Sequence, residues 1–324
     1  MTNIEDAAEE ATEELKPKTL KQKIWNIAKL LLKIGITTVL LIWVFNKVDF
    51  NAVKYRLLHP QYWWMYLIAI ICFFLSMIVS AWRLLSFFRS IGLNLNPKYN
   101  LRLYFLGMFY NILLPGGIGG DGYKMYLINK TYKVPVKRLF WAVMFDRLSG
   151  LWIIGLLAVT LSFFIPQLAA YTWMAAGIFA GGSLIYYFVI HKFFKDYTRY
   201  FFQAHAKALV LQLLQLGTVL CIILSQPDFY QAGFKGTFPP YLLSFLLSGF
   251  AILIPTAGGA GAREAFFTAL SKVFPINADI GVLIATSFYL ISVFVALSGL
   301  YYMLKPSRLQ AGIPAKNNKE NDIV

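Results

Sequence analysis

Residues 62–85 read YWWMYLIAIICFFLSMIVSAWRLL, an apolar stretch longer than the helices that soluble proteins usually bury. A helix needs about 20 mostly apolar residues to cross a bilayer, and this stretch provides them. The pattern recurs, and we predict six full spans at residues 27–45, 62–85, 139–163, 171–190, 208–224 and 280–304. The sequence therefore predicts an all-α, polytopic integral membrane protein.

The overall composition excludes several other classes of protein. Of the 324 residues, 58% are hydrophobic and 14% are charged, and the mean hydropathy is +0.60. The formal charge is +15, but Lys and Arg gather in short loops between apolar segments, which fits membrane orientation better than nucleic-acid binding. The three histidines have no metal-ligand spacing, and the two cysteines lie in apolar stretches, so we expect neither a metal site nor a disulfide framework.

The loop charges predict the topology, because cytoplasmic loops collect Lys and Arg. The basic regions carry 23 Lys and Arg against five in the other loops. These basic regions are the N-terminal segment, residues 83–102, 124–138 and 192–207, and the C-terminal tail. We therefore expect cytoplasmic tails at 1–26 and 306–324 around a transmembrane domain at 27–305.

Two further apolar segments are interrupted by Pro and Gly. They read NILLPGGIGGDGYKMYLI at residues 111–128 and AILIPTAGGAGAREAFFTAL at residues 251–270. Both flanks of the first are basic and both flanks of the second are poor in charge, so we predict two re-entrant hairpins that dip from opposite faces. This pattern is typical of an inverted repeat, which in transporters places the substrate site near the midplane.

The hairpins supply the candidate site, because irregular backbone at membrane depth persists only beside protein or a water-filled cavity. Pro115 and Pro255 are predicted to end the first half-helices, and glycine N–H groups at the start of the return helix favour anions. Gly177 and Gly181, in a uniform span, instead fit close helix packing. The candidate substrate-binding residues are Gly116, Gly117, Gly119, Gly120, Asp121, Lys124, Gly258, Gly259, Gly261, Arg263 and Glu264, with Asp146, Arg147, Pro115 and Pro255 as secondary candidates.

Charged residues inside apolar segments need a partner or water. Opposite charges that are adjacent in sequence suggest local neutralisation, although neighbours on a helix point in different directions. Snorkelling to the interface is the alternative for Lys124 and Arg147. The candidate pairs are Asp146 with Arg147, Arg263 with Glu264 and, across the hairpins, Asp121 with Arg263.

The sequence gives no support for nucleotide binding. Gly117, Gly119 and Gly122 match the G-x-G-x-x-G string of dinucleotide folds, but that motif requires a preceding strand, and here an apolar half-helix and Pro115 precede it. No G-x-x-x-x-G-K-[ST] string occurs. We therefore expect no cofactor and no ATP-driven transport by this chain alone.

Four strings resemble the transmembrane region of lysylphosphatidylglycerol synthases, also called the flippase-like domain, and the resemblance covers residues 32–305. The most specific is LLPGGIGGDGYK at 113–124, followed by IPTAGGAGAREAFF at 254–267. Ala257 stands where family members often have a second Pro, a mild departure. The other two strings are SAWRLLSFFRSIG at 80–92 and VMFDRLSGL at 143–151.

The resemblance implies a multi-pass protein of the bacterial inner membrane that handles lipids. In bifunctional family members this domain flips an aminoacylated phospholipid made by a soluble C-terminal transferase. The sequence ends soon after the last predicted span, so we expect a stand-alone member that does not lysylate lipids. Membrane lipids, and a separate lipid-modifying enzyme, are the expected partners.

Three functions are compatible with the sequence. The first is translocation of a phospholipid or lipid-linked anionic substrate between leaflets. The second is an intramembrane lipid transferase that uses Asp121 or Asp146 as a base, against which the scattered histidines argue. The third is a membrane scaffold for a separate lipid- or glycan-modifying enzyme, which would tolerate substitution throughout both hairpins.

Overall fold

The computed structural model describes residues 50–113, 119–226, 238–250 and 261–310, and these residues contain helices and no β-strand. The elements in chain order are α3 (Phe50–Leu58), α4 (Trp64–Ser90), α5 (Pro97–Leu113), α6 (Gly119–Tyr132), α7 (Val136–Ser162), η1 (Pro166–Leu168), α8 (Ala169–Phe193), η2 (Lys195–Tyr197), α9 (Phe201–Leu224), α11 (Phe238–Ser248), α12 (Ala262–Leu270), α13 (Ala278–Ala296), α14 (Ser298–Leu304) and α15 (Pro306–Gln310).

Five helical segments are long and apolar enough to cross a membrane: α4, α7, η1 with α8, α9, and α13 with α14. They correspond to five of the six predicted spans, and the sixth, 27–45, lies outside the described residues. The protein is thus an all-α, polytopic membrane protein. Helix α9 begins at Phe201, seven residues before the predicted start of the span at 208. Gln203 and Lys207 are polar and therefore lie outside the apolar stretch, but they and the alanines between them are good helix formers, so the helix extends through them.

The two interrupted segments form pairs of short helices, as predicted. Helix α5 ends at Leu113 and packs against α6, which begins at Gly119; α11 ends at Ser248 and packs against α12, which begins at Ala262. At about 1.5 Å per residue these four helices are roughly 14 to 26 Å long, less than the roughly 30 Å of a hydrocarbon core. Within the described residues, none of the four meets the length and apolarity of a candidate membrane span.

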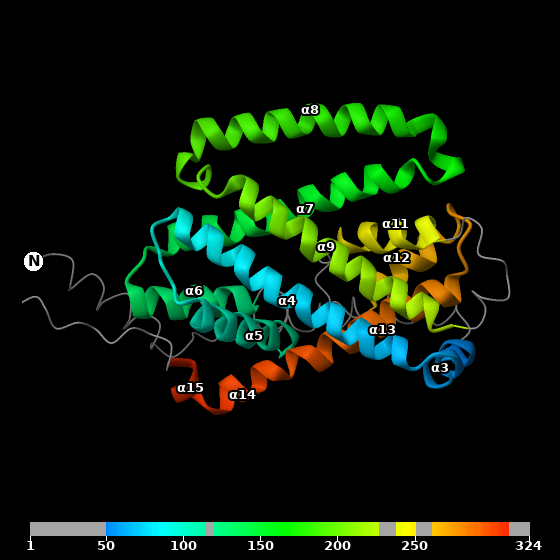
Figure 1. Cartoon of the computed structure of the whole chain (residues 1–324), viewed down its shortest axis with the longest axis horizontal. Coiled ribbons are helices and arrows are strands. Elements are labelled where there is room, and N and C mark those ends of the chain that lie inside the picture. The colour runs from blue at the N-terminus through cyan, green and yellow to red at the C-terminus, as the bar shows by residue number, and fades with distance from the viewer. Residues whose placement is uncertain (1–49, 114–118, 227–237, 251–260, 311–324) are drawn as a thin grey trace, which may run out of the picture.

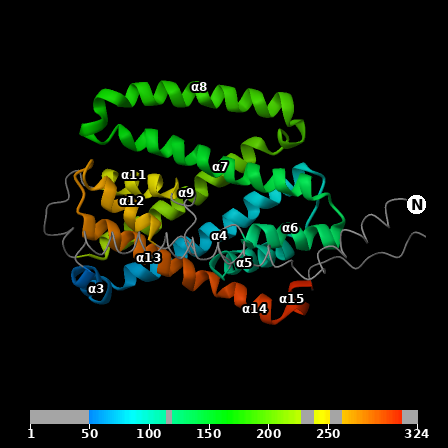
Figure 2. The same ribbon diagram turned by 180° about the vertical axis from the view of Figure 1, so that it is seen from behind.

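The two pairs lie toward opposite ends of the molecule. Figure 1 shows α5 and α6 toward the end where α4 ends and α7 begins, and α11 and α12 toward the end where α7 ends and α13 begins. The view from behind in Figure 2 agrees. The basic loops after α4, α6 and α8 share the first end, and the loops after α7 and α12 share the other. This arrangement fits hairpins that dip from opposite faces, which stays a prediction.

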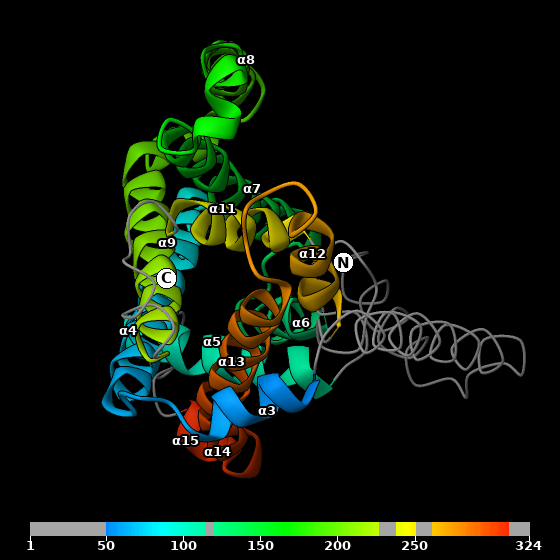
Figure 3. The same ribbon diagram turned by 90° about the vertical axis from the view of Figure 1, so that its right-hand side faces the viewer.

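Helix α8 lies outside the main bundle. It packs along α7, and both Figure 1 and the end-on view in Figure 3 show it apart from the other helices. A Cβ built at Gly177 or Gly181 would meet no described atom within 4 Å. The interpretation of these two glycines as close-packing positions is therefore wrong within the described chain, because α8 presents them away from its neighbours.

Candidate functional site

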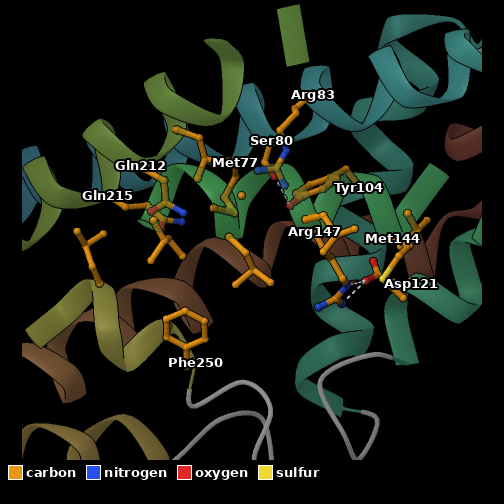
Figure 4. Close-up of a pocket in the computed structure, with 18 of the residues that line it drawn as sticks. Met77, Ser80, Arg83, Tyr104, Asp121, Met144, Arg147, Gln212, Gln215 and Phe250 are labelled. Carbon is orange, nitrogen blue, oxygen red and sulfur yellow. Dashed lines mark hydrogen bonds and ion pairs between the residues drawn. The ribbon is translucent and has the colours of Figure 1, made fainter. Parts of the chain in front are cut away.

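A cavity of about 620 Å³ is lined by residues of both helix pairs together with α4, α7 and α9. Tyr104 of α5 and Asp121 of α6 reach it from one pair, and Phe245 of α11 and Arg263 of α12 reach it from the other. Most of the remaining lining is aliphatic or aromatic. Two segments about 140 residues apart in the sequence thus face one internal space, part of which is drawn in Figure 4.

Asp121 is the centre of a buried ion-pair network at the start of α6. Its carboxylate accepts hydrogen bonds from Lys124, with Nζ at 2.6 Å, and from the guanidinium of Arg147 on α7, whose Nε lies at 3.1 Å. The expected pair of Asp121 with Arg263 is therefore wrong. Because α6 brings Lys124 round to the same face after one turn, the partner of Asp121 comes from its own helix and from α7 rather than from the second pair.

Lys124 does not snorkel to the interface. It is 4% exposed, and its Nζ lies 4.7 Å from the centre of the Tyr104 ring. Gly107 of α5 makes room for its stem, because a Cβ there would lie 2.9 Å from two Lys124 carbons. The Arg147 side chain remains 33% exposed and lines the cavity. The snorkelling alternative is wrong for Lys124, whose charge is neutralised inside the protein.

Asp146 is paired with Arg83, not with its sequence neighbour Arg147. The Arg83 guanidinium donates two parallel hydrogen bonds, Nε to Oδ1 at 2.8 Å and Nη2 to Oδ2 at 2.9 Å, and both residues are buried. Gly150, one turn after Asp146, leaves space for the Arg83 guanidinium, since a Cβ at position 150 would lie 3.0 Å from one of its nitrogens. Residues 146 and 147 point about 100° apart on α7, so each meets a different helix.

Arg263 lies between two aromatic rings. Its guanidinium carbon is 4.9 Å from the ring centres of both Phe245 and Phe288, and Nη1 lies 3.4 Å from the hydroxyl of Ser248. Within the described residues no carboxylate forms an ion pair with it. The carboxylate of Glu264 is also buried and accepts a hydrogen bond from Thr286 at 3.4 Å; it forms no direct ion pair with Arg263, although the two charges still attract one another electrostatically.

The described glycines have structural roles. The Gly120 N–H donates to Asn111 Oδ1 at 2.7 Å, and a Cβ at this position would overlap the carbonyl oxygen of Gly107. Gly120 thus lets α5 and α6 touch, and its N–H is not free for a substrate. Gly261 has φ +79° immediately before α12, a conformation that favours glycine. Gly119 begins α6. The candidates outside the described residues are Pro115, Gly116, Gly117, Pro255, Gly258 and Gly259.

The sequence was compared with models of known protein families. The sequence model of the family described as lysylphosphatidylglycerol synthase TM region matches residues 30–299, a range that includes both helix pairs and every residue that lines the cavity. The chain belongs to this family. No curated protein matches it. As a member of the lysylphosphatidylglycerol synthase transmembrane-region family, it is a membrane protein related to lipid modification or translocation.

This family member also has cavity residues that the sequence reasoning missed. Arg83 was counted among loop cations but sits inside α4, and the apolar residues on both sides of it were the available signal. Ser80 and Tyr104, whose hydroxyl oxygens are 2.6 Å apart, were not singled out. Gln212 and Gln215 line the cavity from α9 and were not singled out within the predicted span 208–224.

The lining carries an excess of positive charge. Arg83, Arg147 and Arg263 line the cavity, and Asp121 is the one carboxylate in the described lining. Among the described residues, no cluster of three or more His, Cys, Asp or Glu could hold a metal ion. Buried positive charge in an apolar space is stabilised by a negative partner, so the cavity is suited to an anionic group beside apolar chains.

Proposed function

We propose that this protein moves a lipid with an anionic headgroup between the two leaflets of the bilayer. The observation that supports it is the cavity shared by both helix pairs, whose lining combines three arginines and one carboxylate with mostly apolar side chains. Arginine binds phosphate well, because its planar guanidinium can donate two parallel hydrogen bonds. In this proposal the headgroup enters the cavity while the acyl chains stay in the hydrocarbon.

The proposal gives each helix pair a role. We propose that both pairs are re-entrant and that each turns within the membrane, so that one faces each side of the bilayer. Small movements of either pair would then expose the cavity to one leaflet at a time, as inverted repeats do in transporters. The inner membrane of a bacterium is the proposed location, and a separate enzyme that makes or consumes the lipid is the proposed partner.

Arg263 is proposed to bind the phosphate. Its guanidinium contacts two aromatic faces and one hydroxyl, and it forms no ion pair with a carboxylate among the described residues. Arg83 and Arg147 already donate to carboxylates. A phosphate would therefore gain more at Arg263 than at either of the other two, because no internal anion has to be displaced.

The test compares Arg263→Ala with wild type for lipid movement in proteoliposomes of anionic lipid. Loss of a charged hydrogen bond, about 1.5 to 3 kcal/mol, should lower the flipping rate at least tenfold. Arg199→Ala is the matched control, because Arg199 is exposed between η2 and α9, away from the cavity, and should flip lipid like wild type. Equal rates in folded Arg263→Ala and wild type would refute the assigned phosphate site. No movement of any lipid by folded wild-type protein would favour the scaffold instead.

The ion pairs of Asp121 and Asp146, the two candidate bases, favour transport over intramembrane chemistry. Asp121 accepts hydrogen bonds from two cations, and Asp146 is held by both arms of Arg83. A general base needs a carboxylate that can reach and accept the substrate proton. Formation of a new lipid by the purified protein alone would contradict this preference.

A further inference from the structure

A second pocket lies at the basic end of the molecule, where the start of α7 meets the end of α8 and the turn η2. Its volume is about 400 Å³, and it shares no described lining residue with the cavity. The loops after α6 and α8, which flank it, both lie at this end (Figure 1). It is therefore a site separate from the one proposed for transport, and we call it the basic pocket.

Four basic side chains and one acidic side chain line the basic pocket. Lys137 and Arg138 come from the first turn of α7, Lys192 from the last turn of α8, and Lys195 and Asp196 from η2. Asp196 lies 3.6 Å from the Arg138 guanidinium. The three lysines form no ion pair with a carboxylate in the described part of the chain. Membrane orientation explains basic loops, but like charges gathered in one hollow repel one another, so this arrangement favours an anionic ligand.

Aromatic packing holds the two basic segments together. The rings of Trp141 on α7 and Phe194 after α8 lie 4.9 Å apart, and both pack against Phe145. The hydroxyl of the buried Tyr197 donates to the carbonyl of Arg138 at 3.4 Å. The lysines are thus carried by two packed segments, and their gathering follows from the fold.

The basic pocket borders apolar side chains that face the lipid. Phe193 lines it and is 66% exposed, and Phe188, five residues earlier on α8, is 59% exposed. The Lys192 Nζ lies 5.5 Å from the centres of both rings. A long cationic side chain beside exposed aromatic rings at a helix end is typical of the membrane interface, where headgroups meet acyl chains. An anion bound here would have an apolar surface for acyl chains next to it, which favours a lipid over a free ion.

The charge and the size of the basic pocket indicate more than one phosphate. A single phosphodiester carries one negative charge and would leave two of the three lysines without a partner. The volume of about 400 Å³ lies within the range of small-molecule pockets, about 300 to 1,000 Å³. Two phosphates on a short spacer would meet lysines from both segments. Basic pockets at the cytoplasmic side of membrane helices suit headgroups of this kind.

We propose that the basic pocket binds a phospholipid whose headgroup carries two phosphates. Lys137 contacts one phosphate and Lys192 and Lys195 contact the other, while the acyl chains lie along α8. The bound lipid then joins the end of α8 to the start of α7. This inference goes beyond the proposed function and does not depend on it, because the lipid is held in one leaflet and is not moved.

The test measures how well the lipid protects individual lysines. The purified full chain in phosphatidylcholine nanodiscs reacts with a water-soluble acetylating reagent, and mass spectrometry gives the rate at each lysine. Diphosphatidylglycerol should slow acetylation of the three lysines of the basic pocket at least fivefold, because each lysine beside a phosphate gains about fivefold in binding. The matched controls, exposed at the same end but outside the pocket, should slow less than twofold; they are Lys98, Lys130 and Lys133.

Two further additives identify the source of the phosphate. Phosphatidylglycerol, with one phosphate per headgroup, should require at least fivefold more total phosphate for the same protection. Glycerol-1,3-bisphosphate, which has two phosphates but no acyl chains, should protect less than twofold at the same total concentration. Equal protection by phosphatidylglycerol would overturn the two-phosphate headgroup, and equal protection by glycerol-1,3-bisphosphate would overturn the lipid.

A substitution in the basic pocket should strengthen binding. Asp196→Asn removes the one acidic side chain from the described lining and frees Arg138 for the ligand. The amount of diphosphatidylglycerol that gives half protection of Lys192 should therefore fall about fivefold. The exposed Asp196 side chain makes no other described ion pair, so the variant should fold. Unchanged or weaker protection in the folded variant would overturn the assigned pocket.

The outcomes separate this inference from the proposed function. No protection of the three lysines, or equal protection of the three controls, would overturn the basic pocket as a lipid site. Selective protection in a protein that flips no lipid would support the basic pocket and overturn the proposed function. Flipping without selective protection would do the reverse.

Discussion

At the scale of single residues, the buried charges depend on one another. Arg83 and Asp146 form a two-armed ion pair between α4 and α7, with both side chains about nine-tenths buried. Removing one member of a buried pair leaves the other charge without a partner, which costs more than the pair itself contributes. The pair therefore sets the register of α4 against α7.

The first prediction concerns this pair. Asp146→Asn should lower the free energy of unfolding by about 3 kcal/mol, because the Arg83 charge stays buried. The double variant Arg83→Met with Asp146→Leu should lose less unfolding free energy than the sum of the losses in the two single variants, since no lone charge remains in it. Reversible unfolding in mixed micelles measures both.

The exposed pair of Arg138 with Asp196 provides the control. Their nitrogen and oxygen lie 3.6 Å apart, and the side chains are 51% and 64% exposed. Asp196→Asn should change stability by less than about 0.5 kcal/mol. Additive costs for Arg83 and Asp146, or an equal effect at Asp196, would contradict the argument.

At the scale of elements, α5 and α6 are held together by a glycine contact. Gly120 of α6 faces Gly107 of α5 so closely that any side chain would strike the backbone opposite. Small residues allow such backbone approach between helices in membranes. This contact places Asp121 and Lys124 next to α7, so it positions the charged side of the cavity.

The second prediction follows from that contact. Gly120→Ala should separate α5 from α6 and lower the unfolding free energy by at least about 2 kcal/mol, because backbone cannot yield as a side chain does. Gly122→Ala is the matched control: it is exposed, a Cβ there meets nothing within 4 Å, and alanine favours the helix. Equal melting temperatures for the two variants in detergent would show that the contact is not needed.

At the scale of the whole molecule, the loops sort onto two ends. The basic loops gather at one end, and the loops poor in charge gather at the other. Cytoplasmic loops collect Lys and Arg, so the first end is expected to face the cytoplasm. Both flanks of the α5 and α6 pair lie at this end, which is what a re-entrant pair requires.

The third prediction tests this orientation with single cysteines in a chain that lacks Cys72 and Cys221. Asn94→Cys before α5 and Thr131→Cys at the end of α6 should react with a membrane-impermeant reagent from the cytoplasmic side only. Gln167→Cys and Lys272→Cys should react from the opposite side only. All four positions are exposed. Labelling of residues 94 and 131 from different sides would show that the first pair crosses the membrane.

Much of the architecture could be predicted because it depends on local properties. Apolarity over about 20 residues decides whether a helix can span, and five described spans follow the sequence closely. The short helix pairs α5 with α6 and α11 with α12 were predictable for the same reason, because Pro and clustered Gly disfavour one continuous helix. Gly261, with its positive φ, is one such residue.

The partners of the charges could not be predicted, because packing between distant segments decides them. Asp146 pairs with Arg83, 63 residues away, and not with Arg147, its neighbour. The two glutamines of α9 carry no signal of their own within an apolar span, and only the packing of the other helices shows that they line a cavity. The sequence by itself determined where the chain crosses and where it breaks, since these are properties of single segments. Only the tertiary structure decided which charges neutralise one another and which polar groups face the cavity, because those choices depend on contacts between helices remote in the chain.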